Sequence, residues 1–178
     1  IENPEATAHT RIGWFRSVSN IPHAFAVQSF VAELAAAAGR DPKDFLLEVI
    51  GPARQVSPEL LGDSWHHGES PERYPVDTGR LRRVAEVAAR EAGWGKPLLK
   101  GRGLGIAAHY SFVSYIAAVV EVAVDEKGVV TVPRVDVAVG SGAGHYPRPR
   151  RAPNQGAGVL GPRLAPPRGG SLKGRRSP

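Results

Sequence analysis

The chain has 178 residues, of which 42% are hydrophobic, enough for one medium-sized domain or for a piece of a larger one. It contains no cysteine, so it forms no disulfide and offers no thiolate to a zinc ion or an iron–sulfur cluster. No apolar run approaches the roughly 18 residues that cross a bilayer, and the start shows no signal-peptide pattern. Methionine is absent and the first residue is Ile1, so we expect a fragment of a longer protein.

The net charge of +6 is unevenly distributed along the chain. The segment from Arg148 to the end contains no acidic residue and eight basic ones: Arg148, Arg150, Arg151, Arg163, Arg168, Lys173, Arg175 and Arg176. Residues 1–147 are therefore close to neutral. The basic character belongs to the tail alone, so whether it indicates nucleic-acid binding depends on what the tail is.

Two helices are predicted near the start. Pro22 fits the first position of a helix, where its missing N–H costs nothing. The helix ends at Gly39 and has one apolar face formed by Val27, Phe30, Val31, Leu34, Ala35 and Ala38. A second, short helix has Asp41 as its cap and Pro42 in its first turn, and it ends before Gly51. Its apolar residues are Phe45, Leu46 and Val49.

A third helix is predicted from Arg80 to Ala92, with Asp77 and Thr78 as its cap and Gly93 at its end. The preceding residues 52–79 are rich in Pro, Gly, Ser, His and charge and read as an irregular surface segment. The stretch "GWGKPLLKGRGLG", which follows the helix, reads as a glycine-punctuated loop.

β-Branched and aromatic residues dominate from Ile106 to Val124, and alternation returns from Val129 to Val139. The turn Asp125–Gly128 joins the two runs into a β-hairpin, with Gly128 where a positive φ is needed. Pro133 indicates an edge position or a bulge. Helices followed by strands predict an α+β fold, divided into residues 1–51, 52–79, 80–139 and a disordered tail, 140–178.

Most candidate motifs carry little chemistry. "GRGLG" (101–105) lacks the six-residue spacing of a nucleotide-binding loop and has no strand before it or helix after it, which favours a flexible connector. His66 and His67 are adjacent, a poor geometry for one metal ion, and are interpreted as surface residues. His109 is interpreted as a structural histidine at the start of a strand. No catalytic or metal-ligating residue is assigned.

Arg16 is the residue with two open interpretations. It lies in "GWFRSVSNIPHAF", which is too apolar for a solvated linker and too irregular for a strand. The segment fits a loop packed on a core, which the residues alone favour, and it also fits a buried loop that places one arginine beside a bound ligand.

Two longer stretches carry a family resemblance: "WFRSVSNIPHAFAVQSFVAELAAAAGRDPKDFLLEVIGP" and "EAGWGKPLLKGRGLGIAAHYSFVSYIAAVVEVAVDEKGVVTVPRVDVAV". Together they resemble the molybdenum-cofactor-binding large subunit of the xanthine dehydrogenase/aldehyde oxidase family. The most similar branch is the bacterial isoquinoline 1-oxidoreductase type. The resemblance covers residues 13 to about 139 in consistent order and is weakest between 52 and 76.

The resemblance implies an enzyme that hydroxylates an aldehyde or an N-heterocycle with oxygen taken from water. It implies a molybdenum–pterin cofactor, and a partner subunit with [2Fe-2S] clusters that removes the electrons. The cofactor supplies the chemistry, while the protein supplies binding, orientation and electrostatics. Neither a membrane span nor a nucleic-acid partner is implied.

The resemblance also assigns site residues. "WFRSVS" lies where other members of the family have A-F-R-G-F-G, which places Phe15, Arg16 and Ser17 at the cofactor. A fixed cation and backbone amides suit an anionic ligand. Val18 takes the position of a substrate-stacking phenylalanine. The two glycines are absent, so we expect the loop to take another shape. The family's catalytic glutamate motif is also absent, so we expect the fragment alone to be inactive.

The tail departs from the family pattern after Val139. A shift of one nucleotide would let 144–150, 159–162 and 166–170 encode the family-like strings V-I-T-P-D-R-V, F-W-G-L and L-H-G-E-V. We interpret the tail as a frameshift product. The alternative is a genuine basic arm on a small non-catalytic module that binds nucleic acid or an acidic partner. We also expect an exposed apolar edge along Phe112–Val124, which would make the isolated chain aggregate.

Overall fold

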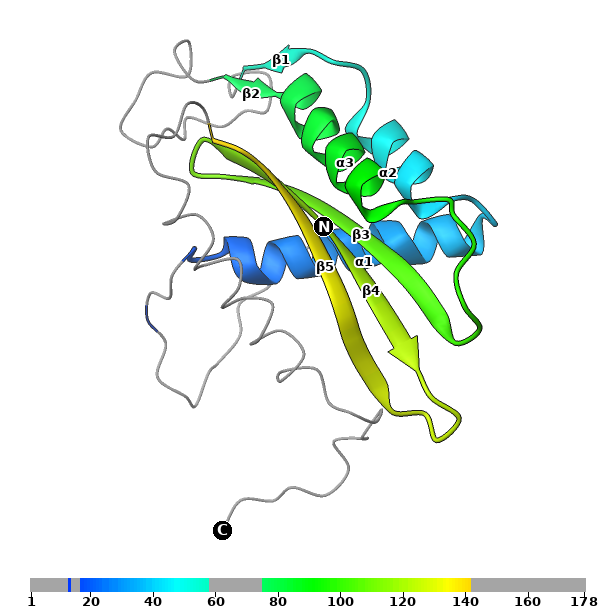
Figure 1. The fold of residues 1–178 in the computed structure, drawn as a ribbon. Helices are drawn as coiled ribbons and strands as arrows, with labels where there is room; N and C mark the ends of the chain where they lie inside the picture. The colour runs from blue at the N-terminus through cyan, green and yellow to red at the C-terminus, as the bar shows by residue number, and fades with distance from the viewer. Residues whose placement is uncertain (1–12, 14–16, 58–74, 142–178) are drawn as a thin grey trace.

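The computed structural model describes Gly13 and residues 17–57 and 75–141, and these form an α+β structure of helices and antiparallel strands (Figure 1). The helices are α1 (Asn20–Ala37), α2 (Pro42–Ile50) and α3 (Thr78–Ala92). The strands are β1 (Gln55–Val56), β2 (Val76–Asp77), β3 (Arg102–Ser111), β4 (Ser114–Val124) and β5 (Val130–Gly140). The tail from residue 142 onward lies outside the described residues, as do His66 and His67.

The main sheet has the order β3-β4-β5, with both pairs antiparallel. β4 is the central strand, because Ile116 pairs with His109 on one side and with Val139 on the other. The expected free edge along Phe112–Val124 is therefore wrong. The free edges of this sheet belong to β3 and β5, since those strands each have one neighbour among the described residues.

The segment "GRGLG" is not a connector, which corrects the interpretation from sequence. Residues 102–105 begin β3 and pair with residues 120–123 of β4. Glycines usually weaken a strand, but two are tolerated here because β4 supplies a complete row of partners. Gly101 precedes the strand with φ +80°, and its carbonyl accepts from the Val124 N–H at 2.7 Å.

Two tight turns join the three strands. The predicted single run from Ile106 to Val124 is broken at Phe112 and Val113, which have φ of +47° and +60°. The predicted turn at 125–128 is confirmed: Gly128 has φ +77°, and Asp125 Oδ1 accepts from the N–H groups of Lys127 and Val129, each at 2.8 Å.

Pro133 occupies a position that suits a residue without an N–H. It lies in β5, an edge strand of the sheet, and the register shifts between Glu121 and Ala123, where two residues of β5 face one of β4. Both sequence-based alternatives, edge and bulge, are thus present together at this residue.

Helix α3 covers one face of the sheet and is well defined at both ends. Asp77 Oδ1 accepts from the N–H of Arg80 at 3.0 Å, and Gly93 closes the helix in the left-handed conformation with φ +74°. Its inner side packs on alternate residues of β4, and the shared core contains Val84, Ala85, Ala88, Tyr115, Ala117 and Val119. The predicted third helix and its cap are confirmed, with the start moved to Thr78.

Tyr115 anchors the junction between α3, the sheet and the β2 segment. Its side chain is 1% exposed, and its hydroxyl accepts from the Asp77 N–H at 2.7 Å. The Arg80 guanidinium lies over the ring, 4.5 Å from its centre. β2 in turn pairs with β1, so the predicted irregular segment 52–79 contains two short paired strands.

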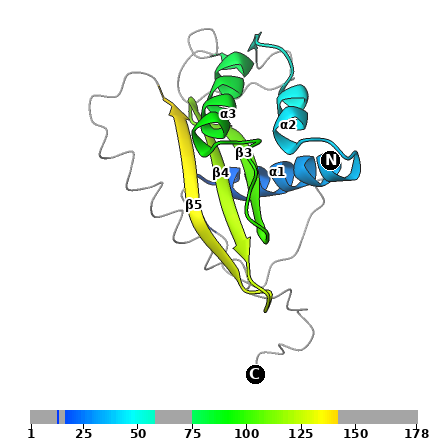
Figure 2. The same cartoon turned by 45° about the vertical axis from the view of Figure 1, so that its right-hand side comes forward.

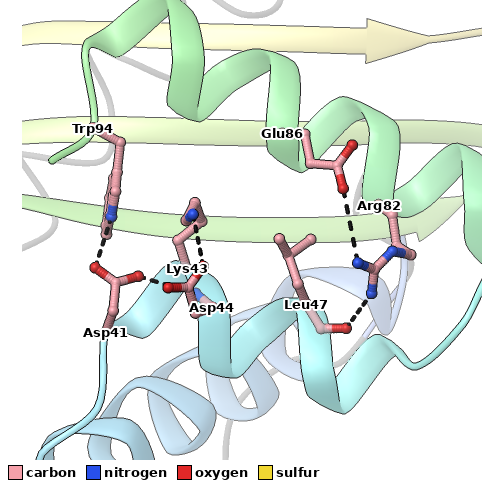
Figure 3. A network of polar contacts seen from close by, with 7 residues as sticks. All are labelled: Asp41, Lys43, Asp44, Leu47, Arg82, Glu86 and Trp94. Carbon is pink, nitrogen blue, oxygen red and sulfur yellow. Dashed lines mark hydrogen bonds and ion pairs between the residues drawn. The ribbon is translucent and has the colours of Figure 1, made fainter.

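Polar contacts fix α2 against α3 (Figure 3). Arg82 of α3 donates to the Leu47 and Gly51 carbonyls at the C-terminal end of α2, at 2.6 and 2.9 Å. At the other end, Trp94 Nε1 donates to Asp41 Oδ2 at 2.9 Å, while Asp41 Oδ1 caps α2 through the Asp44 N–H. The second predicted helix and its aspartate cap are confirmed.

Helix α1 begins two residues before Pro22, which therefore lies in its first turn and not at its first position. Val31 and Ala35 are its buried residues. Phe30 and Leu34, predicted on the buried face, are 58% and 41% exposed. The outer surface of the helix is also apolar, with Ile21 and Phe25 at 55% and 76% exposed. No helix in the described ranges combines the length and apolarity needed to cross a membrane.

Candidate functional site

The turn before α1 holds the described part of the predicted cofactor-side segment. Ser17 is half-buried and Val18 is 49% exposed, while Phe15 and Arg16 lie outside the described residues. The turn is closed by a hydrogen bond from the Asn20 N–H to the Ser17 carbonyl at 2.9 Å. A second hydrogen bond joins the His23 N–H to the Ser19 carbonyl at 3.2 Å.

The backbone of this turn is strained. Ser17 and Val18 have φ of +68° and +47°, a left-handed conformation that costs a residue with a side chain about 1–2 kcal/mol. Ser17 stands where the family pattern has its first glycine, the residue that adopts this conformation most easily. For the β-branched Val18 a positive φ is an outlier of the kind that clusters at ligand-binding sites.

Two side-chain contacts hold α1 along the free edge of β3. Gln28 Oε1 accepts from the Ala108 N–H at 3.1 Å, which satisfies a backbone donor that has no strand partner. About two turns earlier in the helix, Asn20 Oδ1 lies 3.0 Å from His109 Nε2. These contacts fix the Ser17–Ser19 turn beside the sheet.

His109 lies near the end of β3, at its eighth residue, and not at the start of a strand as predicted. Its hydrogen bond to Asn20 supports the structural role interpreted from sequence. Partial burial lowers the pKa of His109, and the nearby His23 lowers this pKa further. His109 is thus neutral at physiological pH, and a ring with its proton on Nε2 donates to Asn20.

Among the described residues, the polar groups around the turn include the hydroxyls of Ser17 and Ser19 and the side chains of Asn20, His23 and His109. They offer hydrogen-bond donors and acceptors that suit the orientation of a polar ligand, and none of them is a carboxylate or a guanidinium. Among the residues that the structure describes, no group of three or more His, Asp or Glu side chains is placed to hold a metal ion.

Sequence reasoning missed the connection between Asn20 and His109. The two residues are separated by 89 positions, and neither belongs to a spaced motif. The apolar alternation around His109 predicted a strand, but it did not indicate that His109 contacts a residue of α1.

The network of Figure 3 is a different kind of polar cluster. Burial alone would raise the pKa of Asp41, but hydrogen bonds from Trp94 and from the backbone of Asp44 and Lys43 lower it overall. The polar atoms of this network serve helix ends and helix–helix contacts. The network therefore stabilises the fold and offers no chemistry of its own.

Comparison with known proteins indicates the class. No family model matches the chain, and no solved structure matches it significantly. Two curated proteins do match, and both are dehydrogenases or parts of dehydrogenases. Both matched proteins are thus named as oxidoreductases.

One of these proteins is the membrane-bound aldehyde dehydrogenase [pyrroloquinoline-quinone] of Gluconacetobacter polyoxogenes, 29% identical over 169 residues that include 90% of the chain. The other is a subunit of the nicotinate dehydrogenase of Pseudomonas putida, 31% identical over 159 residues that include 85% of the chain. The chain spans 20% of the length of the first and 12% of the second.

The two matches support the predicted family only in that both proteins are dehydrogenases. They are in line with the xanthine dehydrogenase/aldehyde oxidase resemblance, but neither name points to isoquinoline as a substrate. A continuous match to 90% of 178 residues runs from about residue 19 or earlier to about residue 160 or beyond. The similarity thus extends into the first part of the basic tail.

Proposed function

We propose that the chain is a segment of the large subunit of a molybdenum-dependent oxidoreductase. Its substrate would be an aldehyde or an N-heterocycle, and the oxygen added would come from water. The observation that carries this proposal is the pair of matched proteins. Their names specify an aldehyde and nicotinate, a pyridine carboxylate, which represent the two substrate classes that the family resemblance implies.

The proposed cofactor is of the molybdenum–pterin type. The name of one matched protein specifies pyrroloquinoline quinone instead, so cofactor identity is a central part of the test. When bound, a molybdenum–pterin group would supply the oxidation of the substrate carbon and pass the electrons to [2Fe-2S] clusters in a partner subunit. The other match is named as one subunit of its dehydrogenase, which supports a complex of more than one polypeptide.

The chain's own contribution would be the segment from Phe15 to Val18. Arg16 would place a fixed cation beside an anionic cofactor, with Phe15 and Ser17 on either side. The left-handed turn at Ser17 and Val18 is in line with this assignment, because strained backbone is enriched at ligand-binding sites. Asn20 is uncharged and the pKa of His109 is lowered by burial, so the proposal leaves the neutralisation of an anion to Arg16.

Val18 would face the substrate. Its aliphatic side chain offers apolar contact without the aromatic stacking that a phenylalanine provides. The Asn20–His109 hydrogen bond would hold the turn in place while substrate and cofactor bind. A fragment that spans a fifth or less of its matched proteins would be inactive alone, since the cofactor and the catalytic glutamate would need other segments.

The test uses the longer polypeptide that contains this chain, produced with its iron–sulfur partner. Metal analysis should find about one molybdenum per large subunit, and oxidative release should give a fluorescent pterin. Oxidation of nicotinate or of an aldehyde should follow. Arg16→Ala should lower both molybdenum content and activity about tenfold or more, whereas Arg40→Ala, in an exposed ion pair with Glu48, should change neither.

Other outcomes would refute the proposal. A protein that contains pyrroloquinoline quinone and no molybdenum would be a dehydrogenase of another cofactor class. A protein without either cofactor that binds DNA, with affinity falling steeply between about 50 and 200 mM salt, would favour the basic-arm module.

A further inference from the structure

The three-stranded sheet has an apolar surface on the side away from α3. Side chains directly opposite each other in an antiparallel pair point to the same face, and neighbours along a strand alternate. Tyr115, Ala117 and Val119 face α3, so the intervening residues face outward. We call this the outer sheet face; it consists of Gly105, Ala107, His109, Ile116, Ala118, Val120, Val135, Val137 and Val139.

The outer sheet face contains no Asp, Glu, Lys or Arg. His109 is its one residue that can bind a proton. Val135, Val137 and Val139 are 36–40% exposed, and Ile116, Ala118 and Val120 are partly buried. The charged residues of β5 lie on the helix side instead, where Arg134 pairs with Asp136 and donates to the Glu91 carbonyl of α3. β5 thus directs its valines outward and its ion pair inward.

This distribution is opposite to that of a sheet with one solvated face. Such a sheet has polar residues on the exposed side and apolar ones against the core. A central strand that reads as a continuous apolar run, as β4 does from Tyr115 to Val120, is typical of a sheet covered on both faces. Figure 2 shows the sheet turned partly edge-on, with α2 and α3 side by side. The side chains of α2 and α3 that enter the core meet Tyr115, Ala117 and Val119, not the outward valines.

We infer that the outer sheet face is an internal packing surface, covered in the intact protein by an apolar layer from the rest of the same polypeptide. This inference rests on the proposed function, since it requires the chain to be part of a longer subunit. The matched proteins are about five and eight times as long as the part that this chain spans, so ample sequence is available to form such a layer.

The position of the site favours the same occupant. His109 lies on the outer sheet face and contacts Asn20, which directly follows the strained Ser17–Ser19 turn. A layer packed on Ile116 and Val139 would therefore end beside that turn. It would bring distant parts of the polypeptide to the segment that the proposed function places at the cofactor.

The test compares Val137→Lys with Val49→Lys. Val49 is an exposed valine of α2, 56% accessible, and lies away from the outer sheet face. In the longer polypeptide, Val137→Lys should lower the melting temperature by about 5 °C or more, because a lysine would be buried without a partner. Val49→Lys should leave it within about 2 °C. In the isolated chain, Val137→Lys should reduce self-association without lowering the melting temperature.

Equal tolerance of the two lysines in the longer polypeptide would overturn the inference. So would a longer polypeptide that forms a dimer which Val137→Lys dissociates, since the occupant would then be a second copy. Cofactor analysis is independent of these readouts. Destabilisation by Val137→Lys in a protein without molybdenum would leave the packing surface established and remove the proposed function.

Discussion

Helices α1 and α3 differ in how they are capped and in how much of their apolar surface is buried. α3 has a side-chain cap at Asp77, a left-handed glycine at its end and one buried face that fits β4. α1 begins at Asn20, and its N-cap residue Ser19 makes no side-chain capping hydrogen bond. The helix is apolar on nearly all sides, yet Val31 and Ala35 are its buried residues. A helix that is apolar all round is typical of a protein interior. The neighbours of α3 are present among the described residues, while 17–57 and 75–141 leave much of the apolar surface of α1 uncovered.

The largest expected effect lies on the α3 side of this comparison. Tyr115→Ala should lower the free energy of unfolding by about 3–5 kcal/mol, because it removes a fully buried ring and the hydroxyl that accepts from Asp77. Phe25→Ala on α1 should change it by less than about 0.5 kcal/mol, since that ring is 76% exposed. Urea denaturation of the isolated chain measures both.

Comparable losses from the two substitutions would show that α1 is packed against a surface in the isolated chain. If Tyr115→Ala does not fold, Tyr115→Phe provides the measurement. It removes the hydroxyl alone and leaves the Asp77 N–H without its acceptor, for an expected loss of about 1–2 kcal/mol.

A smaller effect is expected at the two helix starts. Asp77→Ala removes an acceptor that binds the Arg80 N–H at 3.0 Å, and it should cost about 1 kcal/mol of stability. Ser19→Ala is the matched change on α1, where the serine side chain makes no capping hydrogen bond, and it should be close to neutral. Thermal unfolding followed by circular dichroism compares them. A cost at Ser19 equal to that at Asp77 would contradict the assignment of the caps.

The smallest expected effect is the pH dependence of the contact between α1 and the sheet. Burial lowers the pKa of His109 in the folded chain, so the unfolded chain binds more protons between that pKa and the unfolded value of about 6.5. Stability from this group is complete above about pH 6.5 and is lost as the pH falls through the folded pKa. His109→Gln should flatten the stability profile below about pH 6.5, whereas an unchanged slope would assign the titration to another group.

The sequence predicted the parts of the fold that depend on local interactions. The aspartate caps of α2 and α3 and the turn at Gly128 each act within about four residues, and all three are confirmed. The strand at 102–105 was missed because its stability comes from β4 and not from its own glycines. Ser17 and Val18 are assigned to the site through the family resemblance alone, and that assignment stays a prediction. The placement of Ser17 beside β3 depends on a contact between Asn20 and His109 that no local pattern encodes.

The buried face of α1 shows the same limit in another form. Its apolar spacing identified a helix, which is a property of the helix alone. The same spacing did not identify which apolar residues are covered, because burial is a property of two surfaces. Phe30 and Val31 differ by one position and are 58% and 8% exposed.

The two turns of the main sheet differ in a way that bears on the order of folding. The β4–β5 turn has a glycine at its positive φ and an aspartate that binds two backbone N–H groups. The β3–β4 turn forces Phe112 and Val113 into left-handed backbone that Asn-Gly adopts far more readily. Hairpins form in about 1–10 μs when their turns are favourable. We therefore expect β4 and β5 to pair first, so that β3 joins a sheet already started and its turn is the late, rate-determining closure.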